Sequence, residues 1–437
     1  MKRFFLTAII ALGGLLLSAQ NFIITNQYIE VEPSELSGLN KVFLLKSLTN
    51  PQAASITYTV QNESKIEFVS FDETGTQTSE QTENNVTSST FYLDGNGNSG
   101  YIVKVDDVDA FTFWIIDYSS CRTQFNSVSW EELDDKCDYL KLVYDVISPE
   151  IKYYNLSGNA YSIDREYEVL YNSLNWNEES NEYSDEPKSI KQKNIVKELS
   201  IEAPLKNTKF YLLDDQYSIA FGYKDTLISA EYNAIAVQTH LVAKVITRDG
   251  LNELDRELKD ETSVKGSAPL NINFTSNPNK FDGQYLKYYE WIISDVKDFS
   301  NYMYKYPDEN LNFTFNNSDT YYVKVSVSNE FCTKSDSIEV IVTESQLLIP
   351  NVFTPNGDGH NDEFRVVYRS LIKFHGIIFN RWGEKVFEWE DPAKGWDGYF
   401  RRKLASSGAY YYIIDAEGSD GIKYKRKGDI NLLRGKE

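Results

Sequence analysis

Histidine and cysteine are scarce in this 437-residue chain, which has only three of each. His360 and His375 lie near the C-terminus, so a catalytic triad or zinc site elsewhere would have to use His240 alone. The chain contains no HExxH, GxSxG or Walker motif, and no GxGxxG after a strand. These absences disfavour the common hydrolases and nucleotide-dependent enzymes. They leave a glycosidase open, because that chemistry needs only two carboxylates.

Long apolar runs are missing beyond the N-terminus. Met1-Lys2-Arg3 is basic, Phe4 to Leu17 is apolar, and small Ala19 precedes a polar stretch, which is the pattern of a secretory signal peptide over residues 1–19. The alternative is a membrane anchor, but the run is shorter than the roughly 20 residues that a span needs. The mature chain is therefore expected to be exported and to lack a transmembrane span.

Three cysteines are too few for a disulfide scaffold. Cys121 and Cys137 are 16 positions apart and could pair in an oxidising compartment, or both could remain thiols. Cys332 would be left over as a small buried hydrophobe.

Basic residues are outnumbered, with 44 Lys and Arg against 65 Asp and Glu, giving a net charge of −21. This charge disfavours nucleic acid as a binding partner, since phosphate binding needs clustered Lys and Arg. Residues 347–437 hold 15 basic and 13 acidic residues, so their balance is +2, and the rest of the chain has 29 − 52 = −23. Solubility outside the cell is enough to explain the acidity. A role in binding divalent cations or cationic glycans is the alternative.

Aromatic residues are abundant, at 14% with 31 Tyr and 24 Phe, and suit half-buried pleated surfaces. Short alternating runs predominate and long helical periodicity is almost absent. The expected class is all-β, a multidomain chain of immunoglobulin-like sandwiches. Its expected parts are a signal peptide (1–19), a β-rich domain (20–145), a second β-rich, possibly immunoglobulin-like domain (146–265), an immunoglobulin-like module (266–345) and a small C-terminal sandwich (346–437).

Several local expectations follow. Residues 110–117 (AFTFWIID) should be central in a sheet, and polar residues 75–89 should form an exposed loop. Residues 130–135 read as one helical turn. Residues 20–265 could also be one large domain instead of two.

Residues 266–345 contain a Trp-bearing strand, Tyr288 to Ile293, followed by DTYYVKVSVSN and DSIEVIVT. This order resembles a PKD-type module, although the usual acidic-glycine turn after the Trp strand is replaced by Ser294 to Lys297. Such modules act as spacers and adhesive repeats, an analogy at the level of the fold.

The C-terminal part carries five blocks in a fixed order, FTPNGDGHND, IFNRWGEKVFEWED, GWDG, SGAYYYII and KGDINLLR. In the first, Pro355 ends a short strand, and Gly357 and Gly359 allow a tight polar turn. The blocks resemble the gliding-motility-associated C-terminal domain, the type B sorting domain of type IX secretion. The residues that carry the resemblance are Phe353, Pro355, Asn356, Gly357, Asp358, Gly359, Asn361, Asp362, Asn380, Arg381, Trp382, Gly383, Trp396, Asp397, Gly398, Gly408, Tyr410, Gly428, Leu432 and Arg434.

The resemblance implies passage through the periplasm to the cell surface or medium, with the outer-membrane type IX secretion and attachment machinery as partner. It implies no catalytic residue. We expect Trp382, Trp389 and Trp396 to be core or turn anchors, Arg381 to pair with Asp397, and residues 410–414 to be buried on both faces. The basic residues Lys423, Lys425, Arg426 and Lys427 form either a solvated edge that resists aggregation or a docking site.

Two loops alternate oxygen ligands as calcium loops do, and both also fit glycine-rich turns. No cofactor is predicted beyond this structural calcium, whose candidate ligands are Asp94, Asn96 and Asn98 in one loop and Asn356, Asp358 and Asp362 in the other.

The predicted function is that of a non-enzymatic surface or secreted protein, an adhesin or a component associated with motility, which could bind a surface glycan or protein. The alternative is a carbohydrate-binding protein or glycoside-active enzyme with its site in residues 20–265. A protease inhibitor or other accessory factor is a third reading. A cleft with paired carboxylates and exposed aromatic residues would favour the alternative.

Overall fold

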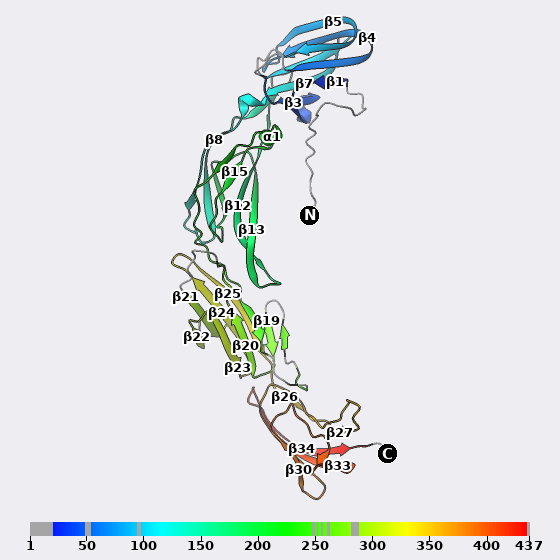
Figure 1. The fold of residues 1–437 in the computed structure, drawn as a ribbon, viewed down its shortest axis with the longest axis vertical. Coiled ribbons are helices and arrows are strands. Elements are labelled where there is room, and N and C mark those ends of the chain that lie inside the picture. Colours follow the sequence, from blue (N-terminus) through cyan, green and yellow to red (C-terminus); the bar gives the residue numbers. More distant parts are fainter. Residues whose placement is uncertain are drawn as a thin grey trace. The chain divides into compact units, whose positions relative to one another are not determined.

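The computed structural model describes residues 21–48, 54–93, 98–246, 250, 252–254, 257–259, 263–280 and 288–434 (Figure 1). Nearly every regular element in these ranges is a strand, apart from α1 (Gln216–Ala220) and two 3-10 turns, η1 (Glu35–Ser37) and η2 (Tyr118–Cys121). The predicted all-β, multidomain class is confirmed. The expected signal peptide lies outside the described residues. None of the helices in the described ranges is long and apolar enough to cross a membrane.

The chain forms two compact units, each described by itself below. The first comprises the described residues up to Ser173 together with Asp185–Ala234, and the second comprises Leu174–Ser184 and the described residues from Ile235 onward.

The first unit begins with a seven-stranded sheet in the order β1-β4-β6-β7-β3-β2, with β5 also paired to β4. The strands are β1 (Phe22–Ile24), β2 (Tyr28–Val31), β3 (Lys41–Leu45), β4 (Ser55–Phe71), β5 (Gln77–Tyr92), β6 (Ser99–Val105) and β7 (Val108–Asp117). Strand β7 is central, as predicted. Phe113 and Ile115 pack into one apolar cluster and Trp114 and Ile116 into another, so both faces of the strand are covered.

The expectation of an exposed loop over residues 75–89 is wrong, because most of that stretch is strand β5. Its polar side chains find partners across the β4–β5 ladder. The hydroxyls of Thr57 and Thr90, for example, lie 2.9 Å apart. Cross-strand Thr and Ser pairs stabilise an antiparallel ribbon even where its surface is wet.

A sandwich follows, with the sheet orders β14-β9-β8 and β13-β12-β15-β16, and it belongs to the first unit except for the Leu174–Ser184 end of the β12–β13 hairpin. Its strands are β8 (Gln124–Glu132), β9 (Tyr139–Ile147), β12 (Glu166–Asn177), β13 (Glu182–Lys193), β14 (Glu198–Glu202), β15 (Tyr211–Leu213) and β16 (Thr226–Ile228). Strand β8 precedes the expected boundary at residue 146 and β9 runs across it, yet both belong to this sandwich. Residues 130–132 are the end of β8, so the expected helical turn is wrong there. The Trp130 ring packs edge-on against Tyr232, with centroids 5.2 Å apart.

Between the seven-stranded sheet and this sandwich in the chain, β10 (Ile151–Tyr154) and β11 (Ala160–Ile163) form a small ribbon. Its residues Ile151, Tyr153 and Ile163 join the apolar cluster that also holds Trp114 of the first sheet and Phe221 after α1. This shared cluster makes the first unit one compact body.

The second unit begins with a sandwich of the sheets β17-β20-β23 and β18-β19-β25-β24-β21-β22. Trp291 is fully buried and packs against Phe274 of the opposite sheet at 6.0 Å between ring centroids, as expected for a core Trp strand. The strands are β17 (Val242–Val245), β18 (Glu257–Lys259), β19 (Ser263–Gly266), β20 (Leu270–Thr275), β21 (Tyr288–Ser294), β22 (Tyr304–Tyr306), β23 (Asn310–Phe315), β24 (Thr320–Ser328) and β25 (Thr333–Val342).

The C-terminal domain of the second unit is built on the five-stranded sheet β27-β34-β33-β29-β30, with two small ribbons, β26-β28 and β31-β32. Its core includes Phe353, Trp389, Trp396 and Ile414. The strands are β26 (Gln346–Leu348), β27 (Val352–Phe353), β28 (Val367–Arg369), β29 (Leu371–Phe379), β30 (Lys385–Trp389), β31 (Tyr399–Phe400), β32 (Lys403–Leu404), β33 (Gly408–Gly418) and β34 (Lys423–Leu432).

Candidate functional site

The first block of the C-terminal domain forms a loop that is closed by one carboxylate. Asp362 accepts the backbone N–H groups of Asn356 (2.9 Å), Gly357 (2.6 Å) and Gly359 (2.7 Å). Gly357 and Gly359 have φ of 79° and 86°, a region that glycine enters at low cost. The loop therefore holds its shape through its own backbone and side chains, as the turn interpretation predicts.

Asp358 is held in the same way. Its Oδ1 accepts the His360 N–H and its Oδ2 accepts the Asn356 amide, both at 2.8 Å. The hydrogen bond from the Asn356 side chain, followed by the one from the His360 backbone, holds the pKa of Asp358 below its ordinary value.

Calcium binding stays a prediction at this loop. The oxygens of Asn356, Asp358 and Asp362 already accept hydrogen bonds within the turn. Across the part of the chain that the structure describes, no group of three His, Cys, Asp or Glu could hold a metal ion. In the other candidate loop, Asp94 and Asn96 lie outside the described residues, and Asn98 Oδ1 accepts the Asp117 N–H at 2.9 Å.

The second block makes the turn between β29 and β30. Asn380 Oδ1 accepts the N–H groups of Trp382 and Glu384, both at 3.0 Å. This turn pushes Trp382 into solvent with 76% of its surface exposed, so the expectation of an anchoring role for Trp382 is wrong. The guanidinium of Arg381 lies 4.5 Å from the Trp382 ring centroid, a cation–π contact, instead of pairing with Asp397.

The remaining blocks meet around Trp396, which is fully buried. Its ring packs on Phe353 and Tyr410, with centroids 5.4 and 4.8 Å away, and its Nε1 donates to the Tyr399 carbonyl at 2.8 Å. The Asp397 carboxylate accepts the Tyr399 N–H at 2.9 Å. Trp396 therefore joins the first block to the third and fourth.

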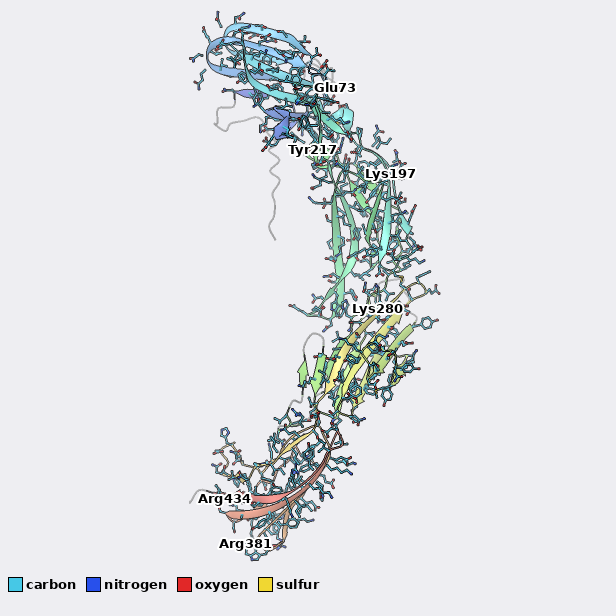
Figure 2. All side chains as sticks on the ribbon, turned by 180° about the vertical axis from the view of Figure 1, so that it is seen from behind. Glu73, Lys197, Tyr217, Lys280, Arg381 and Arg434 are labelled. Carbon is cyan, nitrogen blue, oxygen red and sulfur yellow. The ribbon has the colours of Figure 1, made fainter. Side chains whose placement is uncertain are left out.

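Gly398 is required at its position for two reasons. Its φ is 76°, and a Cβ there would lie 3.0 Å from Pro355 Cγ and 3.2 Å from Arg434 Nη2. Arg434 in turn donates to the carbonyls of Gly398 (3.0 Å) and Ala405 (2.9 Å). Figure 2 shows Arg434 and Arg381 at separate places on this domain. The first, third and fifth blocks thus meet at one point.

The solvent-facing side of the same sheet holds a groove of about 560 Å³. It is lined by Asn380, Arg381 and Gly383 of the turn and by residues of β29, β33 and β34. Tyr411 and Ile413 face this side and are 49% and 48% exposed. The expectation that residues 410–414 are buried on both faces is therefore wrong.

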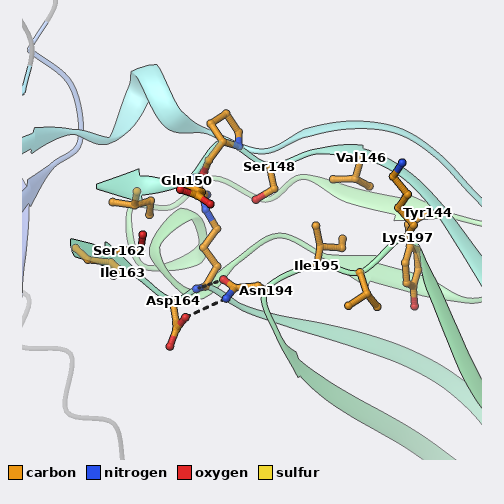
Figure 3. Close-up of a pocket in the computed structure, with 14 residues that line it drawn as sticks. Tyr144, Val146, Ser148, Glu150, Ser162, Ile163, Asp164, Asn194, Ile195 and Lys197 are labelled. Atoms are coloured by element: carbon orange, nitrogen blue, oxygen red, sulfur yellow. Dashed lines mark hydrogen bonds between the residues drawn. The ribbon is translucent and has the colours of Figure 1, made fainter. Parts of the chain in front are cut away.

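The first unit has a different cavity, of about 350 Å³, near β10 and β11 (Figure 3). Two carboxylates, Glu150 and Asp164, are among the residues that line it, and both are engaged. Glu150 pairs with Lys152 at 2.7 Å. Hydrogen bonds from Lys193, at 2.6 Å, and from Asn194 hold the pKa of Asp164 below its usual range. Glycosidic cleavage needs a carboxyl group with a raised pKa as its acid, and Asp164 is the opposite.

Beside this cavity lies a buried polar cluster that the sequence did not reveal. Asp215, at 0% exposure, caps α1 by accepting the N–H groups of Tyr217 and Ser218 at 2.9 Å, and it accepts the Tyr118 hydroxyl at 2.7 Å. Arg165 is 2% exposed and pairs with Asp215. It also donates to the carbonyls of Cys121 and Pro149. The one available sequence signal was Asp215 itself, a residue type that favours a helix N-cap.

The neighbouring Asp214 has a pKa raised by burial, but it is 1% exposed, so substrate cannot reach it. The cluster therefore ties segments of the first unit together and is not a reaction site.

The proposed pairing of Cys121 with Cys137 is wrong. Cys121 is a free, buried thiol, and burial raises its pKa to about 11, so it remains protonated and unreactive. Cys137 is disulfide-bonded. Cys332 is 3% exposed, as expected, but it too is disulfide-bonded and is not left over.

Comparison with known families identifies two parts of the chain. Residues 347–432 match the CHU_C type IX secretion signal domain, and residues 129–229 match the fibronectin type III domain. The chain thus ends in a type IX secretion signal domain, and an immunoglobulin-like domain precedes it. The signal indicates export to the cell surface or extracellular space and interaction with the secretion machinery. The PKD-like assignment of residues 266–345 stays a prediction.

A search of curated proteins finds no match. Similar solved structures include a tetra-tandem repeat from the extending region of a large adhesion protein (11% identity, 90% of this chain and 98% of that chain, TM-score 0.22). Others are the FN1–FN3 domains of chicken CNTN1 (9%, 71% and 97%, TM-score 0.23) and a Ca2+-stabilized, ice-binding adhesin of an Antarctic bacterium (9%, 87% and 94%, TM-score 0.20). Scores this low carry no argument about function.

Proposed function

We propose that this chain is a non-enzymatic binding protein of the cell surface or medium, an adhesin or a component associated with motility, which its C-terminal domain delivers through type IX secretion. The observation that carries the proposal is the secretion signal domain at residues 347–432. The other matched domain, at residues 129–229, is fibronectin type III, which is of a non-catalytic kind.

The state of the described carboxylates supports a binding role. Asp164 and Glu150 are held by lysines, and Asp214 is enclosed. A catalytic acid must be open to substrate and have a raised pKa, whereas the pKa of Asp164 is lowered and Asp214 is closed to substrate. A binding role needs no such group.

The delivery role of the C-terminal domain is tested by fractionating cells of the native host that express either the full chain or a chain ending at Ser345. We expect the full chain at the surface or in the medium and the shortened chain in the periplasm. Export of the shortened chain would remove the C-terminal domain from the delivery role.

The binding role is tested in a strain that lacks this chain. Attachment to surfaces and spreading on agar should both recover when the full chain is restored. Unchanged attachment and spreading in the deletion strain would contradict an adhesive or motility role.

The second candidate is a glycan-binding or glycoside-active protein, favoured by the cavity of about 350 Å³, whose size suits a small ligand. The purified chain would be applied to a glycan array and assayed for release of reducing sugars. Binding that is lost in Asn194→Leu, without sugar release, would favour glycan binding. Sugar release that is lost in Glu150→Gln would favour an enzyme.

A further inference from the structure

The solvent-facing side of the C-terminal sheet carries an apolar patch on adjacent strands. Tyr410 and Ile414 of β33 enter the core, so Tyr411 and Ile413 between them point outward. The register places Tyr411 beside Phe379 and Ile413 beside Ile377 of β29. Large apolar side chains that gather on one exposed face of a soluble domain mark an interaction surface.

Charged side chains of both signs border this patch. On β34, Lys427 lies opposite Ile413, Lys425 lies opposite Asp415, and Asp429, which also lines the groove, lies opposite Tyr411. Both lysines are exposed, and neither makes a salt bridge to any residue that the structure describes. On the other side, the turn that contains Trp382 projects Arg381 along the groove of about 560 Å³.

We propose that this outer sheet face (Arg381, Trp382, Tyr411, Ile413, Lys425 and Lys427) docks an acidic protein surface of the secretion machinery. The inference rests on the proposed delivery by type IX secretion and assigns the docking surface to residues. Trp, Tyr and Arg are the residues that most often dominate binding energy at protein interfaces. Unpaired lysines at the rim add attraction to carboxylates and steer their approach.

A protein fits this face better than a glycan does. Branched aliphatic side chains, Ile413 and Ile377, lie beside the aromatic residues, and they pack against apolar side chains better than against sugar rings. The amide of Asn380, which could bind hydroxyl groups, is already used within its own turn. Arg381, Lys425 and Lys427 outnumber Asp415 and Asp429 on this face, which favours an acidic partner.

The test measures export of full-length variants in the native host. Trp382→Ala/Tyr411→Ser should raise the periplasmic share at least about tenfold, the effect of losing two hot-spot side chains. Its matched control is Tyr399→Ser, because Tyr399 is 48% exposed in the same domain but lies on β31. Lys427→Glu should also retain the protein, whereas Lys403→Glu, at an exposed and unpaired lysine on β32, should not.

Thermal unfolding of the purified chains separates docking from folding. If the double variant melts earlier than the wild type, the comparison of Lys427→Glu with Lys403→Glu decides. Normal export of Lys427→Glu and of a stable double variant, while the chain ending at Ser345 is retained, would overturn the docking face and leave the delivery role intact. Export of the shortened chain would overturn both.

A glycan partner is tested with polygalacturonate as the probe. Binding of the full chain that disappears in the double variant, with export unchanged, would assign the face to an acidic glycan and overturn the protein docking. Retention of the variants without polygalacturonate binding is the expected result.

Discussion

Arg165 and Arg381 each lie beside an aromatic ring, but they differ in burial and in the groups around them. Arg165 is 5.8 Å from the Tyr118 ring centroid and is buried among carbonyls and a carboxylate. Arg381 is 4.5 Å from the Trp382 ring centroid and lies beside an open groove. The pair of an arginine and an aromatic ring serves stability at Arg165, whose guanidinium donates to Asp215 and to two backbone carbonyls inside the fold. The pair of an arginine and an aromatic ring is available to a partner at Arg381, where the Trp382 ring and the nearby lysines face water.

The contrast predicts which phenotype each site gives. A change in the buried cluster leaves a charge without its partner, and that cost falls on folding. A change on the outer sheet face removes contacts that the free protein does not make, so its cost falls on docking and export.

The largest effect is expected from Asp215→Ala. It leaves the Arg165 guanidinium buried without its carboxylate and removes the cap from α1, at a cost of about 3–5 kcal/mol. Guanidinium unfolding of the purified chain, together with amide hydrogen exchange over residues 214–221, measures the loss. Asp225→Ala is the control, because the partly exposed Asp225–Arg122 pair should contribute only about 0–1 kcal/mol. Equal losses in the two variants would contradict the importance of burial.

Two tryptophans of the C-terminal domain sharpen the comparison. Trp396→Ala should cost about 3–5 kcal/mol, because it empties the centre of the core. Trp382→Ala should change the stability by less than about 0.5 kcal/mol, because its side chain is in solvent. Unfolding curves of both variants measure this, and a large loss in Trp382→Ala would show that the residue serves the fold after all.

A smaller effect is expected at Gly398. Gly398→Ala should cost more than Gly383→Ala, although both positions have positive φ, which alone costs about 1–2 kcal/mol for alanine. The reason is that a Cβ at residue 398 meets Pro355 and Arg434, whereas one at residue 383 meets nothing within 4 Å. Thermal midpoints of the two variants give the order, and equal midpoints would mean that Pro355 and Arg434 move aside freely.

Sequence reasoning found the class and the core where the pattern was clear. Residues 110–117 form a central strand, Trp291 and Trp396 are core residues, and the turn residues around Asp362 behave as turn chemistry requires. Prediction from the sequence failed where the residue types did not show the alternation between core and surface. The run from Tyr410 to Ile414 has no polar residue, so its alternation between core and solvent cannot be read from the sequence.

The buried cluster and strand β5 were missed for related reasons. Arg165 and Asp215 are 50 residues apart, and nothing local shows that they meet. Strand β5 is almost wholly polar and is stabilised by its partner β4, so its own composition indicates a loop. Tertiary pairing decided these elements, and a single sequence does not reveal tertiary pairing.

The smallest effect is expected from the histidines, whose side chains differ in how far they are buried. His240 is half-buried, with its ring stacked on Trp176 at 4.4 Å and an interplanar angle of 8°, whereas His360 is exposed. Burial lowers the pKa of His240, and Asp336 and Glu178 oppose that shift. A histidine that titrates lower in the folded chain than the unfolded value of about 6.5 favours the neutral ring. Its contribution to stability is therefore present above about pH 6.5 and is lost as the pH falls through the folded pKa.

NMR titration of the histidines should give His240 a midpoint below about 6.5, and Glu178→Gln should lower that midpoint further. His240→Gln should flatten the fall in thermal midpoint just below pH 6.5. A midpoint for His240 above 6.5 would mean that the two carboxylates outweigh the covering Trp176 ring, and the dependence on pH would then reverse its sign.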